Sequence, residues 1–245
     1  MSDKVALVTG GARGIGRTIV KTLVDSGYMV VANYNNSEAR AKSLQDELGD
    51  RVYTYKADIS NEVEVKAMVD DIVARYGRID VLVNNAAVCI DSLFQDKTVE
   101  NFRKTLDTNV VGTFVVSRYV ANVMYANKKG CIVNMASTNG INTYFPMCID
   151  YDASKAAIIS LTHNLAMQYA PYIRVNAIAP GFIATESEIK DMDEDFIRQE
   201  EEKILLRRAG TELDVAKLVR FLCSEDSEYI NNEVIRIDGG MYGNS

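Results

Sequence analysis

The chain has 245 residues, of which 47% are hydrophobic and 25% are charged, a composition typical of a globular protein with a substantial core. The net charge of -7 and the lack of a Lys/Arg-rich run argue against a nucleic-acid partner, because phosphate binding needs clustered positive charge. No apolar run is as long as a membrane span, and the opening MSDKVALVTGG lacks the basic region and long apolar core of a signal peptide.

Apolar, β-rich segments alternate with helical segments along the chain. The predicted strands span residues 4–10, 28–34, 51–59, 79–87, 130–137, 173–181 and 233–240. The predicted helices span residues 15–26, 37–48, 62–76, 109–126 and 151–169. Near-continuous apolar strands that alternate with helices indicate a parallel sheet covered on both faces. No Pro/Gly-rich linker divides the chain, so we expect one α/β domain over residues 1–245, a Rossmann-like doubly wound parallel sheet of about seven strands.

The segment TGGARGIG, residues 9–16, follows the first predicted strand and opens the first predicted helix. Gly10, Gly14 and Gly16 allow the backbone to turn tightly and to approach a pyrophosphate at a helix N-terminus. The spacing is G-x-x-x-G-x-G, which differs from the G-x-G-x-x-G of the commonest dinucleotide-binding fold. The loop therefore indicates a nucleotide site at the carboxyl end of the first strand.

Tyr151 precedes Lys155 by four residues at the start of the predicted helix 151–169. Residues four apart lie on one face of a helix, and a lysine ammonium beside a phenol favours the phenolate and lowers the pKa of the tyrosine. Such a tyrosine can act as a general acid or base near neutral pH. Tyr125 and Lys129 have the same spacing, so spacing alone does not separate a catalytic pair from a solvated surface pair.

One segment interrupts the alternation of strands and helices. Residues 184–210, ATESEIKDMDEDFIRQEEEKILLRRAG, are acidic and helix-prone and follow the carboxyl end of the sixth predicted strand. They form either a solvated surface excursion or a mobile lid over the substrate.

Taken in order, these motifs resemble the short-chain dehydrogenase/reductase family, and within it the 3-oxoacyl-acyl-carrier-protein reductase branch. The resemblance covers essentially the whole chain, through TGGARGIG, NNAA at 84–87, NVVGTF at 109–114, Y-x-x-x-K at 151–155, VNAIAPGFIAT at 175–185 and IDGGM at 237–241. It implies an oxidoreductase that interconverts a ketone and a secondary alcohol with a nicotinamide cofactor. It also implies that Tyr125 and Lys129, which precede the fifth strand, are a surface pair.

The resemblance also implies roles for individual residues. Tyr151 would give the proton, Ser137 would hydrogen-bond the same oxygen, and Lys155 would lower the pKa of Tyr151 and hold the nicotinamide ribose. Asn109 would hold a water that replaces the proton, and no metal is needed. The expected cofactor-binding residues are Gly10, Gly11, Ala12, Arg13, Gly14, Ile15, Gly16, Asn33, Tyr34, Asn35, Asn36, Asp58, Ile59, Asn85, Ala86, Ala87, Tyr151, Lys155, Pro180, Gly181, Ile183 and Thr185.

Two positions depart from the family pattern. One residue more than the family commonly has separates Ser137 from Tyr151, and the loop INTYFPMCID is its expected place, where it would reshape the floor of the pocket. Ala87 stands where the family has glycine and adds a methyl group beside the nicotinamide, with a small expected effect.

The cofactor is expected to be NADP(H) in preference to NAD(H). An acidic residue at the end of the second strand would accept the ribose hydroxyls of NAD and repel a 2′-phosphate. The sequence there is ANYNNSE, with no carboxylate before Glu38. Arg13 stands in the glycine loop, where NADP-using relatives often have a basic residue, and would pair with the phosphate unless it is simply a solvated surface arginine.

The substrate is less clearly specified. Lys128 and Lys129 could help to dock an acidic carrier protein, but Pro171 and Tyr172 stand where such reductases often have a basic residue, and residues 184–210 are acidic. The alternative is an NADP(H)- or NAD(H)-dependent dehydrogenase of a free sugar, polyol or steroid. A non-catalytic protein that senses the cofactor is a third hypothesis, which the presence of all four catalytic residues opposes.

The four cysteines, Cys89, Cys131, Cys148 and Cys223, include no C-x-x-C pair, so we expect a reduced, cytoplasmic protein. His163 is the one histidine, which excludes a histidine-rich metal site.

The predicted helix 151–169 is apolar over much of its surface, which suits burial on more than one side. Because family members usually pair through this helix and the one after Asn109, we expect a homotetramer, with a dimer as the alternative.

Overall fold

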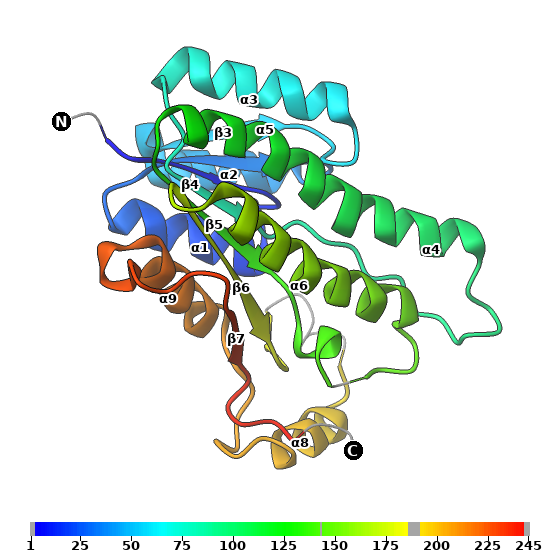
Figure 1. Cartoon of the computed structure of the whole chain (residues 1–245). Helices are drawn as coiled ribbons and strands as arrows, with labels where there is room; N and C mark the ends of the chain where they lie inside the picture. Colours follow the sequence, from blue (N-terminus) through cyan, green and yellow to red (C-terminus); the bar gives the residue numbers. More distant parts are fainter. Residues whose placement is uncertain (1–2, 143, 186–191, 243–245) are drawn as a thin grey trace.

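Seven parallel strands form the centre of the molecule, in the order β3-β2-β1-β4-β5-β6-β7 (Figure 1). The structure is a computed structural model that describes residues 3–142, 144–185 and 192–242. The strands are β1 (Val5–Val8), β2 (Met29–Tyr34), β3 (Val52–Lys56), β4 (Val81–Asn84), β5 (Gly130–Met135), β6 (Ile173–Pro180) and β7 (Val234–Ile237). This parallel sheet confirms the predicted fold class.

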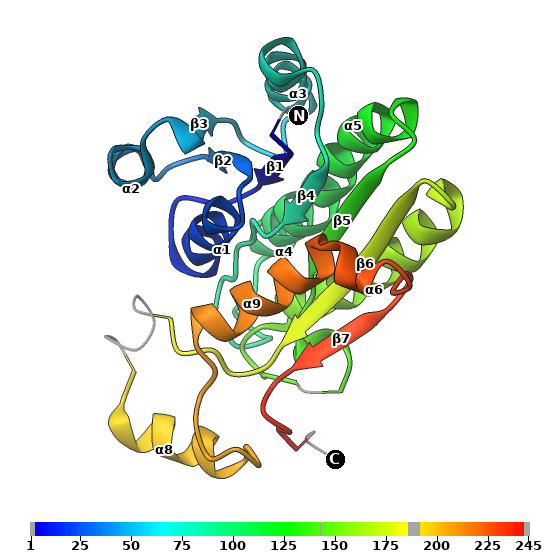
Figure 2. The ribbon, with the colours of Figure 1, turned by 90° about the vertical axis from the view of Figure 1, so that its left-hand side faces the viewer.

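Helices cover both faces of the sheet, as Figure 2 shows. One face carries α1 (Gly14–Asp25), α2 (Glu38–Leu48) and α9 (Glu212–Cys223); the other carries α3 (Glu62–Tyr76), α5 (Thr113–Ala126) and α6 (Ile149–Tyr169). All four residues of β1 and all four of β4 are buried, which is why β1 is wholly apolar and β4 is apolar except for Asn84. The Asn84 amide donates to Ser117 Oγ and Asn134 Oδ1. Within the described residues, no helix is both long and apolar enough to cross a membrane.

The chain changes direction across the sheet between β1 and β4. From β1 it passes to β2 and β3 on one side, and it then returns to β4 and continues to β7 on the other side. The loops that follow β1 and β4 therefore leave adjacent strand ends in opposite senses. Ligands of doubly wound sheets bind in the crevice at such a switch point.

The helices α4 and α9 were not predicted from the sequence, and α5 begins at Thr113, later than the predicted residue 109. The helix expected at 109–126 is preceded by α4 (Val99–Leu106), and a π-helical turn, Asp107–Gly112, connects α4 to α5. The missed helix α9 begins with a capping box in which Thr211 and Asp214 satisfy each other's backbone N–H groups. That Thr-x-x-Asp pattern is a readable signal for a helix N-terminus.

The segment proposed as a lid contains α8 (Glu194–Glu202), and its residues 186–191 lie outside the described residues. Its two ends lie side by side, because the Ala184 N–H donates to Gly210 O at 2.8 Å and the Gly210 N–H donates to Phe182 O at 3.0 Å. Ile204 is buried against Gly239 near the C-terminus. The described part of the segment is thus anchored at the carboxyl ends of β6 and β7.

Candidate active site

The glycine loop forms a narrow turn between β1 and α1. Gly10 and Gly14 have φ values of +64° and +53°, a region in which a side chain is strained. A Cβ on Gly16 would lie 2.2 Å from Gly10 O and 2.6 Å from Asn85 Nδ2, so only glycine fits there. The loop thus leaves backbone N–H groups at the start of α1 without side chains over them, which is the cradle that a pyrophosphate requires.

The side chain of Asn85, which follows β4, holds the glycine loop in place. Its Nδ2 donates to Thr9 O at 3.0 Å and to Gly10 O at 3.2 Å, while Thr9 Oγ1 accepts from the N–H groups of Asn85 and Ala86. The ends of β1 and β4 are therefore joined by side-chain hydrogen bonds. Asn85, expected to bind the cofactor, uses its amide nitrogen to hold the glycine loop.

Asn33, at the end of β2, has a similar internal role. It is 2% exposed, and its Nδ2 donates to Ala57 O at 2.9 Å. The Gly11 N–H donates to Asn33 O at 2.9 Å, so this residue holds the glycine loop to the ends of β2 and β3. Its side chain is buried between the ends of β1 and β3, and the side chains at this end of β2 that reach the surface are the half-buried Tyr34 and the exposed Asn35 and Asn36.

Asp58 follows β3 at the same edge. Ser60 donates to Asp58 Oδ1 from its hydroxyl at 2.6 Å and from its backbone at 2.9 Å, and Asn35 Nδ2 donates to Oδ2 at 3.0 Å. Burial acts to raise the pKa of the Asp58 carboxyl, but these hydrogen bonds outweigh it and the pKa is lowered. An ionised acceptor thus lies beside the end of β2.

Basic side chains near the glycine loop differ in their availability. Arg13 is exposed and makes no hydrogen bond or ion pair with any described residue. Arg17, one helical turn further on, is held by Glu47 at 2.6 Å and by Arg40 O. Arg13 is therefore the cation of this loop that is available to an incoming anion.

Tyr151 and Lys155 lie on the first turns of α6. Lys155 is 4% exposed, and its Nζ donates to Met135 O, at the end of β5, at 2.6 Å. The same Nζ lies 5.3 Å from the centre of the Tyr151 ring. Ser137 follows Met135 by two residues and accepts a hydrogen bond from the Asn139 N–H at 3.2 Å. The end of β5 thus brings Ser137, Tyr151 and Lys155 together.

The environment of Lys155 changes its acidity. Burial lowers the pKa of the amine from 10.5 to about 8, and the charge of the nearby Cys89 opposes this change. A lysine with this pKa is charged at neutral pH but can lose its proton in mildly alkaline solution.

Asn109 lies in the π-helical turn and is 1% exposed. Its Oδ1 accepts from the Val88 N–H at 2.8 Å, and its Nδ2 donates to Val88 O at 2.9 Å and to Ser154 Oγ at 3.0 Å. The amide is fully used in joining the segment after β4 to α6. π-Helical turns are frequent at functional sites.

The other predicted cofactor residues lie at the same edge of the sheet. Ala86 and Ala87 follow β4, and Ile183 pairs with Gly210 beyond β6. Thr185 is 7% exposed. The remaining ones are Ala12 and Ile15 in the glycine loop, Ile59 after β3, and Pro180 and Gly181 at the end of β6.

A buried ion pair that the sequence analysis missed supports the start of α6. Lys97 Nζ lies 2.9 Å from Asp150 Oδ1, and the two side chains are 4% and 0% exposed. Thr105 Oγ1 donates to the other carboxylate oxygen at 2.7 Å, and Lys97 Nζ also donates to Ile90 O. Burial acts to raise the pKa of Asp150, but Thr105 and Lys97 lower it below its ordinary value.

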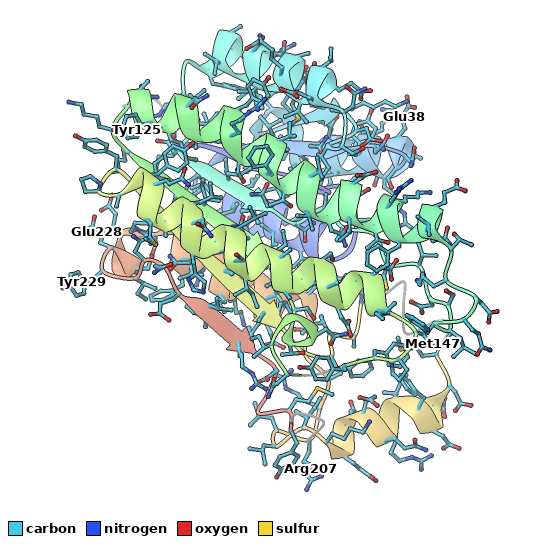
Figure 3. The ribbon with its side chains drawn as sticks, turned by 45° about the vertical axis from the view of Figure 1, so that its right-hand side comes forward. Glu38, Tyr125, Met147, Arg207, Glu228 and Tyr229 are labelled. Carbon is cyan, nitrogen blue, oxygen red and sulfur yellow. The ribbon has the colours of Figure 1, made fainter. Side chains whose placement is uncertain are left out.

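Lys128 and Lys129, expected to help dock a carrier protein, lie at the opposite end of the strands, before the start of β5. They precede β5, whereas Lys155 contacts its carboxyl end. Tyr125, which precedes them, is 48% exposed and lies at the end of the α5 and α6 layer remote from Met147 (Figure 3). Within one chain these lysines do not flank Tyr151, and they could do so only in an assembly of several chains.

The chain is similar to known reductases over nearly its whole length. A family model described as enoyl-(acyl carrier protein) reductase matches residues 10–242. The 3-oxoacyl-[acyl-carrier-protein] reductase FabG of Staphylococcus epidermidis is 36% identical over 244 residues, which cover 98% of this chain and 99% of that protein. The acetoacetyl-CoA reductase of Acinetobacter sp. is 38% identical over 245 residues, which cover 98% of each chain.

Solved structures show the same fold and similar length. ElxO with NADP bound has a TM-score of 0.90 and 34% sequence identity, with 97% of this chain and 98% of that chain covered. A tyrosine-to-phenylalanine variant of ElxO with NADPH bound matches equally well.

The ion pair below Tyr151 generates a prediction about stability. Lys97→Met should lower the free energy of unfolding by about 3–5 kcal/mol, because it leaves the Asp150 carboxylate buried without its cation. Urea unfolding, read as the change in midpoint at constant slope, measures this difference.

The matched control is Lys66→Met, which removes the lysine of an exposed pair with Asp70. It should cost less than about 1 kcal/mol, because exposed ion pairs contribute little. Equal losses for the two variants would contradict a special role for the buried pair.

Proposed function

Since the chain belongs to the short-chain dehydrogenase/reductase family, we propose that it is a ketoreductase that uses NADPH to reduce the 3-oxo group of an acyl thioester. The observation that carries this proposal is the arrangement of Tyr151 and Lys155 beside the end of β5, next to Ser137. The names of the relatives supply the substrate class, because FabG acts in them as a 3-oxoacyl-[acyl-carrier-protein] reductase and the Acinetobacter protein as an acetoacetyl-CoA reductase.

The crevice beside the glycine loop fits a dinucleotide cofactor. The space that a Cβ on Gly16 would fill is occupied by the Gly10 carbonyl and Asn85, and the loop ends at the N-terminus of α1. The backbone N–H groups of residues 11–16 would hold the pyrophosphate, and Lys155 would hold the ribose next to the nicotinamide. When bound, the cofactor supplies the hydride.

The side chains at the end of β5 complete the reaction. The carbonyl oxygen of a ketone gains negative charge as it is reduced, so it needs a hydrogen-bond donor and a proton. The Tyr151 hydroxyl gives that proton, and the Ser137 hydroxyl donates a hydrogen bond to the same oxygen. The charged amine of Lys155 stabilises the phenolate that remains on Tyr151.

Apolar side chains near the start of α6 support an acyl substrate. Leu93 and Phe94 are 50% and 75% exposed, and Phe145 is 40% exposed. Their two segments meet where the Ser92 N–H donates to Met147 O at 3.0 Å. An acyl chain would cover this apolar surface, whereas a sugar or polyol would leave it in water. The described residues 192–210 of the acidic segment, with 184–185, would close over it as a lid.

The choice of NADPH rests on Arg13 and on the end of β2. Arg13 is exposed and without a partner among the described residues, and no carboxylate stands at positions 33–37. A 2′-phosphate there would gain a charge-assisted hydrogen bond from Arg13. The nearest acid described at this end of β2, Asp58, is already engaged by Asn35 and Ser60. The NADP and NADPH bound by ElxO are consistent with this preference.

Apolar residues on the outer surface support a homotetramer. Phe114 on α5 is 43% exposed and Met167 on α6 is 74% exposed. Burial of such side chains against a second copy would stabilise an assembly.

The direct test of the function is reduction of acetoacetyl-CoA and of an acetoacetyl carrier protein, followed by the loss of NADPH absorbance. Tyr151→Phe should lower kcat by at least about 100-fold, because it removes the proton donor, and should leave NADPH binding unchanged. Tyr125→Phe, the control at the far end of α5, should keep wild-type turnover. Full turnover by folded Tyr151→Phe would refute the assignment.

The cofactor preference should depend on one arginine. Arg13→Ala should raise the KM for NADPH by roughly 5- to 150-fold, the equivalent of the 1–3 kcal/mol of a hydrogen bond to a charged group, and should leave the KM for NADH almost unchanged. Tyr34→Asp should shift the preference towards NADH by repelling the phosphate. Equal weakening of both cofactors by Arg13→Ala would show instead that Arg13 supports the glycine loop.

The assembly can be measured by light scattering at micromolar concentration. A homotetramer should have four times the chain mass of 27.2 kDa. Replacing Met167 with Lys should shift the protein to smaller species, because it would put a charge into the apolar interface. A wild-type protein that remains at 27.2 kDa would rule out this assembly.

A further inference from the structure

Two cysteines from distant parts of the chain meet at the entrance to the candidate active site. Cys89 follows β4 and is exposed, while Cys148 directly precedes α6 and is buried. Their Sγ atoms lie 3.0 Å apart. A disulfide bond is about 2.0 Å long, so a movement of about 1 Å would join them.

The two segments that carry these sulfurs are already held together. The Ser92 N–H donates to Met147 O at 3.0 Å, and the buried ion pair joins Lys97, which follows Cys89 in the chain, to Asp150, which follows Cys148. These contacts hold the two sulfurs near each other, so that a movement of only about 1 Å separates them from bonding distance.

A carboxylate completes the group. Asp91 Oδ1 lies 3.2 Å from Cys89 Sγ and 3.0 Å from Cys148 Sγ, and both thiols can donate to it. The hydrogen bond with Cys89, then burial and Asp91, raise the pKa of Cys148 well above its ordinary value. Cys148 is thus the protonated partner, and the exposed Cys89 is the sulfur that an oxidant in solution can reach.

We propose that Cys89 and Cys148 are a site of oxidative modification, which hydrogen peroxide converts to a disulfide that lowers the reductase activity. The Cys89 thiolate attacks one peroxide oxygen, the O–O bond breaks, and the departing hydroxide takes a proton to become water. The Cys148 sulfur then attacks the resulting sulfenic acid, its proton passes through Asp91 to the departing hydroxide, and a second water leaves. Two thiols are oxidised, and one peroxide is reduced to two waters.

The effect on activity rests on the proposed function and follows from the position of the two sulfurs. Cys89 adjoins Val88, which Asn109 holds through two hydrogen bonds, and Cys148 lies three residues before Tyr151. Closing the sulfurs to bonding distance would move one of these segments towards the other. A displacement of about 1 Å near reacting groups can reduce a rate by about 100-fold.

The sulfurs of Cys89 and Cys148 and a carboxylate oxygen of Asp91 could instead hold a metal ion, since the three atoms lie close together. Two thiolates on a tetrahedral zinc ion, each about 2.3 Å from it, are about 3.8 Å apart. The observed 3.0 Å between the sulfurs is shorter and closer to the distance needed for a disulfide. We therefore favour the oxidised pair over a zinc site.

The chain also provides an internal comparison. Cys131 and Cys223 form a second pair of neighbouring thiols, 5% and 7% exposed, inside the core between the sheet and α9. Neither of these two thiols is exposed, whereas the first pair includes the exposed Cys89. Oxidation of the native protein should therefore be confined to Cys89 and Cys148.

To test the proposal, the protein is treated with hydrogen peroxide, and the remaining thiols are blocked with N-ethylmaleimide in denaturant. Mass spectrometry then measures the intact mass and identifies the linked peptides. We expect the loss of two hydrogens, two maleimide adducts in place of four, and a peptide that joins Cys89 to Cys148. Reduction of acetoacetyl-CoA should fall by about 10- to 100-fold in parallel and return with dithiothreitol.

Cys89→Ser should keep its activity and its remaining three thiols during the same treatment, and Cys148→Ser provides a second test that removes the other partner. Cys131→Ala should behave like wild type.

Four free thiols after treatment, or equal loss of activity in Cys89→Ser, would overturn the proposal. Unoxidised thiols together with a zinc ion that wild type retains and Cys148→Ser loses would also overturn it, in favour of a metal site. If the disulfide forms in a protein without reductase activity, the proposed function fails and the modification site does not.

Discussion

The structure of the site depends on the burial of one positive charge, the amine of Lys155. The sheet covers it, and the carbonyl of Met135 accepts its hydrogen bond at 2.6 Å. The lowering of its pKa from 10.5 to about 8 means that the charged amine reduces the stability of the fold by about 3 kcal/mol. Because the folded-state pKa is the lower one, the cost is fully present below pH 8 and disappears only as the pH rises above the unfolded-state value. At neutral pH the fold therefore maintains a costly charge where a phenol can use it.

Several polar contacts between the start of α6 and other elements hold that charge in place. Asp152 accepts from Asn139 Nδ2 at 2.7 Å and ties the helix to the turn after Ser137. Asn109 and Ser154 join it to the segment after β4, and Asp150 joins it to Lys97. A helix fixed on three sides has little freedom to tilt, so Tyr151 keeps its position relative to Lys155. Such support is what lets a site on a regular element orient a proton donor reproducibly.

Most of the fold could be predicted from the sequence, because it depends on patterns that are local. The buried strands are continuous apolar runs, the glycine loop has its own spacing, and Tyr151 and Lys155 are four residues apart on one helix. Even α9 had a readable start in Thr211 and Asp214. The inward orientation of Asn33 could not be predicted, because it depends on the register of β2 against β1 and β3. The Lys97–Asp150 and Cys89–Cys148 pairs each join residues more than fifty positions apart, and nothing in their local sequence links them. The roles of the predicted site residues in catalysis and cofactor binding remain predictions to be measured.

The pKa of the Lys155 amine can be measured by NMR of protein labelled at its lysine side chains, without cofactor. The Lys155 signal is the one that is missing from the spectrum of Lys155→Met, and the exposed Lys66 provides a reference in the same sample. The buried amine should titrate with a midpoint of about 8, well below the roughly 10.4 of an ordinary lysine. A Lys155 signal that titrates together with that of Lys66 would contradict the account, because the charge beside Tyr151 would then be solvated.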